Sequence, residues 1–192
     1  MQRETLDPAT RKRFRTGRPC LDFVHTGGVG RWVAAELIHD AGDAGFWLAL
    51  VLDLDAVKAT EADVEPLRAL REALWQLAQA AIAGRAFAAE HVSVVNAAAA
   101  APPPQLVMSA DGALVTAPVE ASQALSALAR DAIDLFTGPL RGRVRECAAE
   151  DCQLLFVDAS RPGRRRWCSM ERCGSLAKMR RYRAPGPGSS RG

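Results

Sequence analysis

Four of the five cysteines in this chain of 192 residues form two short-range pairs near its C-terminal end. The segment "CAAEDC" carries Cys147 and Cys152, and "CSMERC" carries Cys168 and Cys173, with 15 residues between the two pairs. Zn²⁺ prefers four soft ligands in a tetrahedron, and two matching pairs joined by a loop of hairpin length supply them with little chain strain. The spacing therefore predicts one structural Zn²⁺ ion held by four thiolates.

The same four residues could instead form a disulfide-bonded or free-thiol cluster, or carry catalytic zinc or redox chemistry. A closed four-thiolate site leaves no open position for a substrate, which favours a structural ion over a catalytic one. The chain shows no apolar run of about 18 residues and no apolar segment behind its basic N-terminus, so we expect a cytoplasmic protein without a membrane partner. A reducing cytoplasm disfavours disulfides. Cys20 lies outside the pattern and is expected to be a buried thiol.

The loop between the cysteine pairs has the pattern of a hairpin. "QLLFVD" predicts an outgoing strand, "ASRPG" a turn and "RRRWC" the returning strand. Ser169 is the expected N-cap of a helix through "MERCGSLAKMRRYR", which places the second cysteine pair at the helix start. At about 100° per residue, the apolar side chains of this helix share one face that we expect to be buried. That face consists of Met170, Cys173, Leu176 and Ala177.

Basic charge is concentrated in the same region. Residues 141–192 hold 13 Lys and Arg against 5 Asp and Glu, a net charge of +8, whereas residues 1–140 hold 12 against 17, a net charge of −5. One Zn²⁺ with four thiolates carries a formal −2, so most of the basic charge is left for a polyanion such as DNA, with a solvated basic surface as the alternative. Arg180 lies near the apolar edge of the helix and could be structural. The predicted nucleic-acid contacts are Arg164, Arg165, Arg166, Lys178, Arg181 and Arg183.

The first 140 residues predict a mixed, mostly helical domain. "CLDFVHTGG" alternates apolar and polar residues and predicts a strand, with "RWVAAELI" as its hairpin partner in a small antiparallel sheet. Asp40 or Asp43 is the expected N-cap of the next helix, and Asp111-Gly112 predicts a hairpin turn. Three further helices are expected over 65–85, with Pro66 in the first turn and Gly84 as its stop, over 86–100 and over 120–138.

The composition changes near residues 138–143, which indicates a domain boundary. We therefore expect an α+β chain with a domain at 1–140, a zinc finger at 141–183 and a disordered tail at 184–192. In the first domain, a polar strand end beside an aromatic helix is a common wall of a ligand pocket. Asp22, His25 and Trp47 are the candidates for such a pocket. We find no nucleophile–base motif, and we do not expect an enzyme.

Together these segments resemble the bacterial family that joins an N-terminal ABATE domain to a C-terminal CGNR-type zinc finger, whose members are described as stress-induced transcription regulators. "LDFVHT" is similar to the opening strand of that family, "FWLAL" to its Trp-containing helix, and residues 147–174 to its finger. The resemblance implies that the finger is a treble clef and that the N-terminal domain senses or regulates. It also implies the metal ligands, which are Cys147, Cys152, Cys168 and Cys173.

Two positions depart from the family pattern. Ser175-Leu176 stands where the signature Cys-Gly-Asn-Arg has Asn-Arg, so a DNA contact made by that pair does not carry over, and His25 stands where the family usually has Asn. We predict a DNA-binding transcription regulator whose N-terminal domain senses a small-molecule effector or forms a homodimer. The alternative is a protein-interaction or RNA-binding adaptor in which the finger is purely structural.

Overall fold

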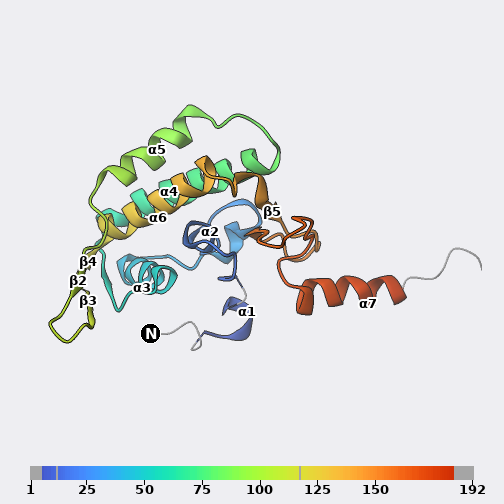
Figure 1. Cartoon of the computed structure of the whole chain (residues 1–192), viewed down its shortest axis with the longest axis horizontal. Coiled ribbons are helices and arrows are strands. Elements are labelled where there is room, and N and C mark those ends of the chain that lie inside the picture. Colours follow the sequence, from blue (N-terminus) through green and yellow to red (C-terminus); the bar gives the residue numbers. More distant parts are fainter. Residues whose placement is uncertain (1–5, 12, 117, 184–192) are drawn as a thin grey trace, which may run out of the picture.

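The structure is a computed structural model that describes residues 6–11, 13–116 and 118–183. Within these ranges, the side chains of residues 9, 31, 106, 114–116 and 181–183 are not described. The tail predicted at 184–192 lies outside the described residues. The described chain is mostly helical with small two-stranded sheets, and it ends in a cluster of four cysteines, which agrees with the predicted α+β class (Figure 1).

Three long helices, α4 (Glu61–Ile82), α5 (Ala89–Ala100) and α6 (Ala121–Thr137), pack against one another. Helix α4 begins four residues earlier than expected, because Thr60 and Asp63 form a capping box that satisfies the first amides. Pro66 therefore lies in the second turn rather than the first. Gly84, with φ of +64°, follows the end of this helix as predicted.

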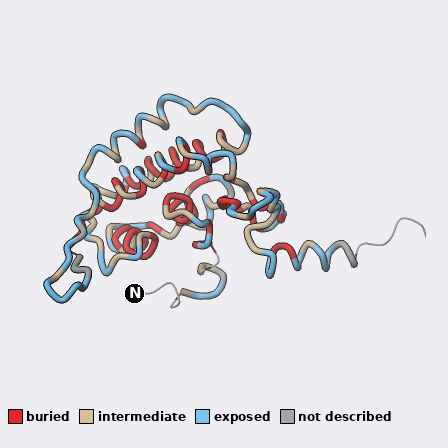
Figure 2. The backbone as a smooth tube through the Cα atoms, viewed as in Figure 1, coloured by how far each residue is buried: buried red, intermediate tan, exposed pale blue. Residues whose placement is uncertain are grey.

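The strand expected at residues 20–28 is wrong, because this segment forms helix α2 (Pro19–Val24). Its neighbours α3 (Ala41–Leu52), α4 and α6 surround it, and every residue from 20 to 24 is buried (Figure 2). A helix buried on all sides shows no apolar stripe, so its sequence can resemble a strand. The expected partner strand is also wrong, because Gly30–Ala35 forms a 3-10 helix (η2). Cys20 is buried, as expected.

Helix α3 starts as the sequence predicts. The Asp40 side chain accepts a hydrogen bond from the backbone N–H of Asp43, and the Asp43 carboxylate accepts one from the N–H of His39. At the start of α2, the guanidinium of Arg18 forms ion pairs with Asp131 and Asp134 of α6. The caps fix the start of α3, and the ion pairs fix the start of α2 against α6.

The described strands form three small sheets. The predicted hairpin at Asp111-Gly112 is confirmed, with β2 (Leu106–Met108) antiparallel to β3 (Leu114–Thr116). Strand β1 (Val57–Lys58) pairs in parallel with β4 (Val119–Glu120), and β5 (Val144–Glu146) is antiparallel to β6 (Leu155–Val157). A short 3-10 turn, η3 (Arg141–Arg143), leads from α6 into β5, and α1 (Pro8–Arg11) precedes α2.

The main hydrophobic core continues from the N-terminal helices into the finger. It includes side chains from α2, α3, α4 and α6, and it also includes Val144, Leu155 and Val157 of the β5–β6 hairpin. A second, smaller cluster surrounds the cysteines and contacts Trp32 of η2. None of the helices in the described ranges is both long enough and apolar enough to span a membrane.

Candidate metal centre and finger surface

The first cysteine pair lies in the tight loop that connects β5 to β6, at the closed end of the hairpin. The last register pair of the hairpin is Glu146 with Leu155, and the N–H of Cys147 continues the ladder by donating to the carbonyl of Leu154 at 2.9 Å. The chain turns back through the N–H of Cys152, which donates to the carbonyl of Ala149. Both thiols therefore project from one short loop on a rigid hairpin.

The second cysteine pair lies at the start of the C-terminal helix. The Ser169 side chain accepts a hydrogen bond from the N–H of Arg172, which confirms the predicted N-cap. The first turn, η4 (Met170–Gly174), is a π-helix and continues as α7 (Ser175–Arg183). Cys168 precedes the cap and Cys173 lies in the π turn, as expected for ligands at a helix start.

The four thiols meet in one cluster, with all their sulfur atoms within 4.8 Å of one another. Cys168 Sγ lies 3.5 Å from Cys152 Sγ and 3.7 Å from Cys173 Sγ. Tetrahedral Zn²⁺ with Zn–S bonds of about 2.3 Å needs sulfur atoms roughly 3.8 Å apart, so the donor set fits this ion. All five cysteines of the chain are free thiols. The finger is thus positioned to bind one structural Zn²⁺.

Hydrogen bonds inside the cluster separate the acidities of its thiols. The thiols of Cys152 and Cys168 donate to Cys147 and lower its pKa, while the same contacts raise the pKa of Cys152 and Cys168. The backbone N–H of Cys168 also points at Cys147 Sγ, at 3.4 Å. Four thiolates need the charge of a cation to be ionised together, so metal binding must displace the remaining protons.

The loop between the pairs does not form the predicted two-stranded hairpin. The outgoing strand exists as β6, but its partner is β5, and the returning segment 164–168 is not a strand. Its position is fixed instead by Asp158, which is fully buried and accepts from the N–H and Oγ of Ser160 and from the N–H of Arg165 at 2.8 Å. The N–H of Ala148 also donates to the carbonyl of Arg166.

Sequence reasoning missed Asp158, although "DAS" at the start of a loop is a signal for a side chain that bonds to the backbone two residues on. Burial by itself would raise the pKa of this carboxyl group, but the hydrogen bonds from Ser160 and Arg165 hold it below its ordinary value. Asp158 therefore stays ionised as the anchor of the loop.

Comparison with known protein families identifies both parts of the chain. A family model named ABATE, with the description "Putative stress-induced transcription regulator", matches residues 17–139. The chain belongs to the ABATE family. The CGNR zinc finger model matches residues 143–185, in the order that the sequence predicted, and neither family is enzymatic. None of the curated proteins compared with the chain matches it.

The basic residues predicted to contact nucleic acid divide into groups. Arg164, Arg166 and Lys178 are exposed. The Arg165 guanidinium is held by the finger itself, because it donates to the carbonyl of Cys168 at 2.7 Å and lies 5.2 Å above the Phe156 ring. Arg181 and Arg183 belong to α7, but their side chains lie outside the described residues.

Arg180, for which the sequence left a structural role open, contacts the finger at its surface. Its guanidinium forms an ion pair with Asp151 of the first cysteine turn at 3.2 Å. Both side chains are more than half exposed, so water screens the pair and its contribution to stability is small.

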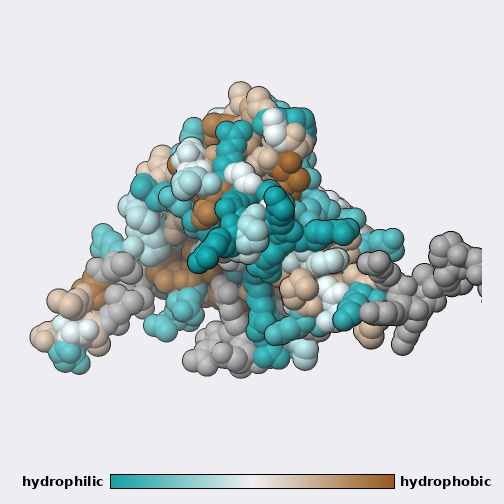
Figure 3. All heavy atoms as spheres, turned by 45° about the vertical axis from the view of Figure 1, so that its right-hand side comes forward, coloured by the Kyte–Doolittle hydropathy of each residue, from teal (hydrophilic) through white to brown (hydrophobic). Residues whose placement is uncertain are grey.

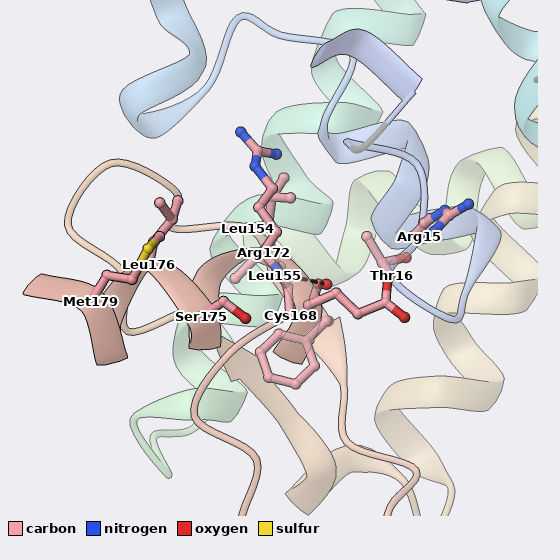
Figure 4. A pocket seen from close by; sticks show the side chains of 12 residues that line it. Arg15, Thr16, Leu154, Leu155, Cys168, Arg172, Ser175, Leu176 and Met179 are labelled. Carbon is pink, nitrogen blue, oxygen red and sulfur yellow. Dashed lines mark hydrogen bonds between the residues drawn. The ribbon is translucent and has the colours of Figure 1, made fainter. Parts of the chain in front are cut away.

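The predicted buried face of the C-terminal helix is wrong at Met170 and Leu176, while Cys173 is buried and Ala177 is half-buried. Met170 is 60% exposed and Leu176 is 37% exposed, and Met179 is 45% exposed. The π turn shifts the phase of the helix, and α7 projects from the body of the ABATE protein (Figure 1). Leu176 and Met179 border a groove of about 480 Å³, and Arg15, Thr16 and the strand β6 line its other side (Figure 4).

The three residues predicted to line a ligand pocket are buried in the ABATE core. Asp22 accepts hydrogen bonds from the N–H and Oγ1 of Thr16, and Trp47 stacks on Phe14 with ring centroids 5.2 Å apart. His25 joins the two parts of the chain, because its Nε2 accepts a hydrogen bond of 2.9 Å from the backbone N–H of Leu155 in the finger. Burial lowers the pKa of His25 to about 3, so the ring is neutral.

Proposed function

We propose that this ABATE protein is a DNA-binding transcription regulator that acts in the cytoplasm, not an enzyme, and that its zinc finger makes the contact with DNA. Cys147, Cys152, Cys168 and Cys173 bind the Zn²⁺ ion and thereby hold the hairpin and α7 in a fixed arrangement. The N-terminal domain then controls the finger by responding to an effector or by forming a homodimer.

The observation that carries this proposal is the uncompensated basic charge of the finger. Residues 141–192 carry a net +8, and a four-thiolate zinc site offsets only two of these charges. Among the acidic groups of the finger, Asp158 is buried and Asp151 is paired with Arg180. Figure 3 shows hydrophilic side chains gathered on one face of the molecule. The net positive charge of the finger attracts phosphates.

In the proposed complex, the exposed cations Arg164, Arg166 and Lys178 bind phosphate oxygens. These residues come from the returning loop and from α7, so one metal ion orders both segments. Arg165 acts as a positioning residue, because its guanidinium holds the carbonyl of Cys168. Contacts to phosphates fix the position of a protein on DNA but do not read its sequence.

The proposal is tested by the salt dependence of binding to duplex DNA. For the zinc-loaded protein, log K should fall linearly with log salt, with a slope of about −0.9 for each phosphate contact. Replacing Arg166 and Lys178 by Glu should flatten the slope by about two and weaken binding at low salt. The matched control is Arg85→Glu, which changes an exposed arginine after α4 and should leave the slope unchanged. Equal slopes in all three proteins would contradict the proposal.

A second candidate, a protein-interaction adaptor, is supported by the apolar groove beside α7. Leu176 and Met179 are partly exposed there although both are apolar, and exposed apolar surface of this kind often marks a contact with another protein. This candidate predicts that the zinc-loaded protein binds a partner protein but not duplex DNA at low salt, and that Met179→Glu abolishes the protein contact. Pull-down with this variant, together with the DNA titration, separates the two candidates.

A further inference from the structure

A cluster of buried N–H groups lies where the ABATE domain meets the finger. Four nitrogen atoms are enclosed there and have no acceptor among the described residues: Arg13 Nε, His25 Nδ1, Trp32 Nε1 and Arg71 Nε. The Arg13 guanidinium lies 4.5 Å from the centre of the Trp32 ring, and the His25 ring lies 5.7 Å from the same ring. Arg71 lies beside them, because its guanidinium donates a hydrogen bond to Oγ1 of Thr26, the residue that follows His25. Buried polar groups are nearly always paired, so the cluster requires an explanation.

All four atoms are donors. The Nε2 atom of His25 accepts from the Leu155 N–H, so the neutral ring carries its proton on Nδ1, and the nitrogens of Trp and Arg can only donate. What the cluster lacks is therefore an acceptor. A water molecule would bring two protons of its own that also need acceptors, whereas an anion only accepts.

The charge of the cluster also favours an anion. Arg13 and Arg71 are only 8% and 2% exposed, and the Glu36 carboxylate binds both terminal nitrogens of Arg71. Arg13 donates instead to a neutral acceptor, the carbonyl of Ala35. Glu36 is the carboxylate that acts on the charge of Arg13, so two buried guanidinium groups share one negative charge. An unpaired buried cation is costly unless a counter-charge joins it.

We propose that Arg13, His25, Trp32 and Arg71 form a binding site for a small oxyanion, such as a carboxylate or phosphate group. Hydrogen bonds from cationic donors to such an oxygen are the strong ones in proteins. The segment that carries Arg13 also supplies one wall of the groove beside α7, through Arg15 and Thr16 (Figure 4).

The site connects the two parts of the molecule. Trp32 packs against the hydrophobic cluster around the cysteines, and His25 holds the backbone of β6. An anion bound there would therefore favour one arrangement of the finger relative to the ABATE domain. This control of the finger rests on the proposed function, whereas the binding of the anion does not.

The experiment measures the thermal unfolding midpoint of the zinc-loaded full chain while acetate, inorganic phosphate or sulfate replaces chloride at constant ionic strength. At least one oxyanion should raise the midpoint in a saturable way, because a ligand that binds the folded state stabilises it. Arg13→Met should weaken the binding of this anion ten- to hundredfold, since it removes a charged donor. Trp32→Phe keeps an aromatic ring but removes one N–H, so it should weaken binding of the anion severalfold. This variant tests the site if Arg13→Met does not fold.

The control Arg85→Met removes an exposed arginine and should leave the anion affinity unchanged. The site is refuted if no oxyanion gives a saturable rise, or if the affinities of Trp32→Phe and the unaltered chain are equal. Failure of DNA binding does not affect this test, because no DNA is present. Saturable binding that leaves DNA affinity unchanged would retain the site and refute only its control of the finger.

Discussion

Asp158 fixes the loop between the two cysteine pairs without binding the metal itself. Replacing this buried carboxylate by Ala leaves the partly buried N–H groups of Ser160 and Arg165 without their acceptor. We expect Asp158→Ala to destabilise the zinc-loaded protein by about 2–4 kcal/mol and to weaken zinc binding, because each buried donor left without an acceptor costs about 1–3 kcal/mol. Chemical denaturation together with a competitive zinc titration measures both effects.

Asp151→Ala is the matched control in the same finger. Asp151 is paired with Arg180 on the surface, where water screens the pair, so its removal should leave the free energy of unfolding nearly unchanged. If the two variants were equally stable, the loop would not depend on Asp158.

His25 makes stability depend on pH. Its pKa is about 3 in the folded protein, whereas an unperturbed histidine has a pKa near 6.5. Between these values the unfolded chain binds one more proton than the folded chain. The contribution of neutral His25 to the free energy of unfolding is therefore complete above pH 6.5. It falls by about 1.4 kcal/mol per pH unit as the pH drops toward 3.

His25→Gln should remove this dependence, because the Gln side-chain oxygen lies about as far from the backbone as His Nε2 and can still accept from the Leu155 N–H, but does not titrate in this range. The measurement is the free energy of unfolding of both proteins between pH 7 and 5. Since the metal centre is the same in both, their difference isolates His25. Parallel curves would show that the buried ring is not the cause.

At the scale of elements, α7 is the helix whose surface differs most from the expectation. Leu176 occupies the position where the family signature has Arg, and it is 37% exposed beside the groove. We expect Leu176→Arg to change the free energy of unfolding by less than about 0.5 kcal/mol and to add one phosphate contact, which steepens the salt slope of DNA binding by about 0.9. Leu176→Gln, which adds no charge, is the control. A steeper slope in both variants would exclude the charge as the cause.

The elements that sequence reasoning predicted share a clear local signal. Helices α4 and α6 each have one apolar face and a capping box, and the Asp111-Gly112 turn fixes a hairpin by itself. Helix α2 gave no such signal, because its surroundings rather than its own pattern make it helical. The cysteines were found from spacing, since metal geometry restricts them locally. Arg13, Trp32 and Arg71 could not be found in this way, because only the tertiary fold brings them together.

At the scale of the whole molecule, the finger is joined to the ABATE domain rather than tethered to it. Val144, Leu155 and Val157 belong to the main core, and His25 bonds across the junction. A conformational change in the N-terminal domain can therefore alter the position of the β5–β6 hairpin, which carries the first cysteine pair. The metal ion then couples this hairpin to α7, which carries part of the basic surface.

The central claim is that a metal-organised finger binds DNA, and one titration tests it most directly. Fluorescence anisotropy of duplex DNA is measured at low salt with the zinc-loaded protein, after chelation of the metal, and after zinc is restored. We predict binding by the loaded protein, at least tenfold weaker binding after chelation, and recovery with about one zinc per chain. Absence of binding by the zinc-loaded protein at low salt, or equal binding with and without zinc, would contradict the claim.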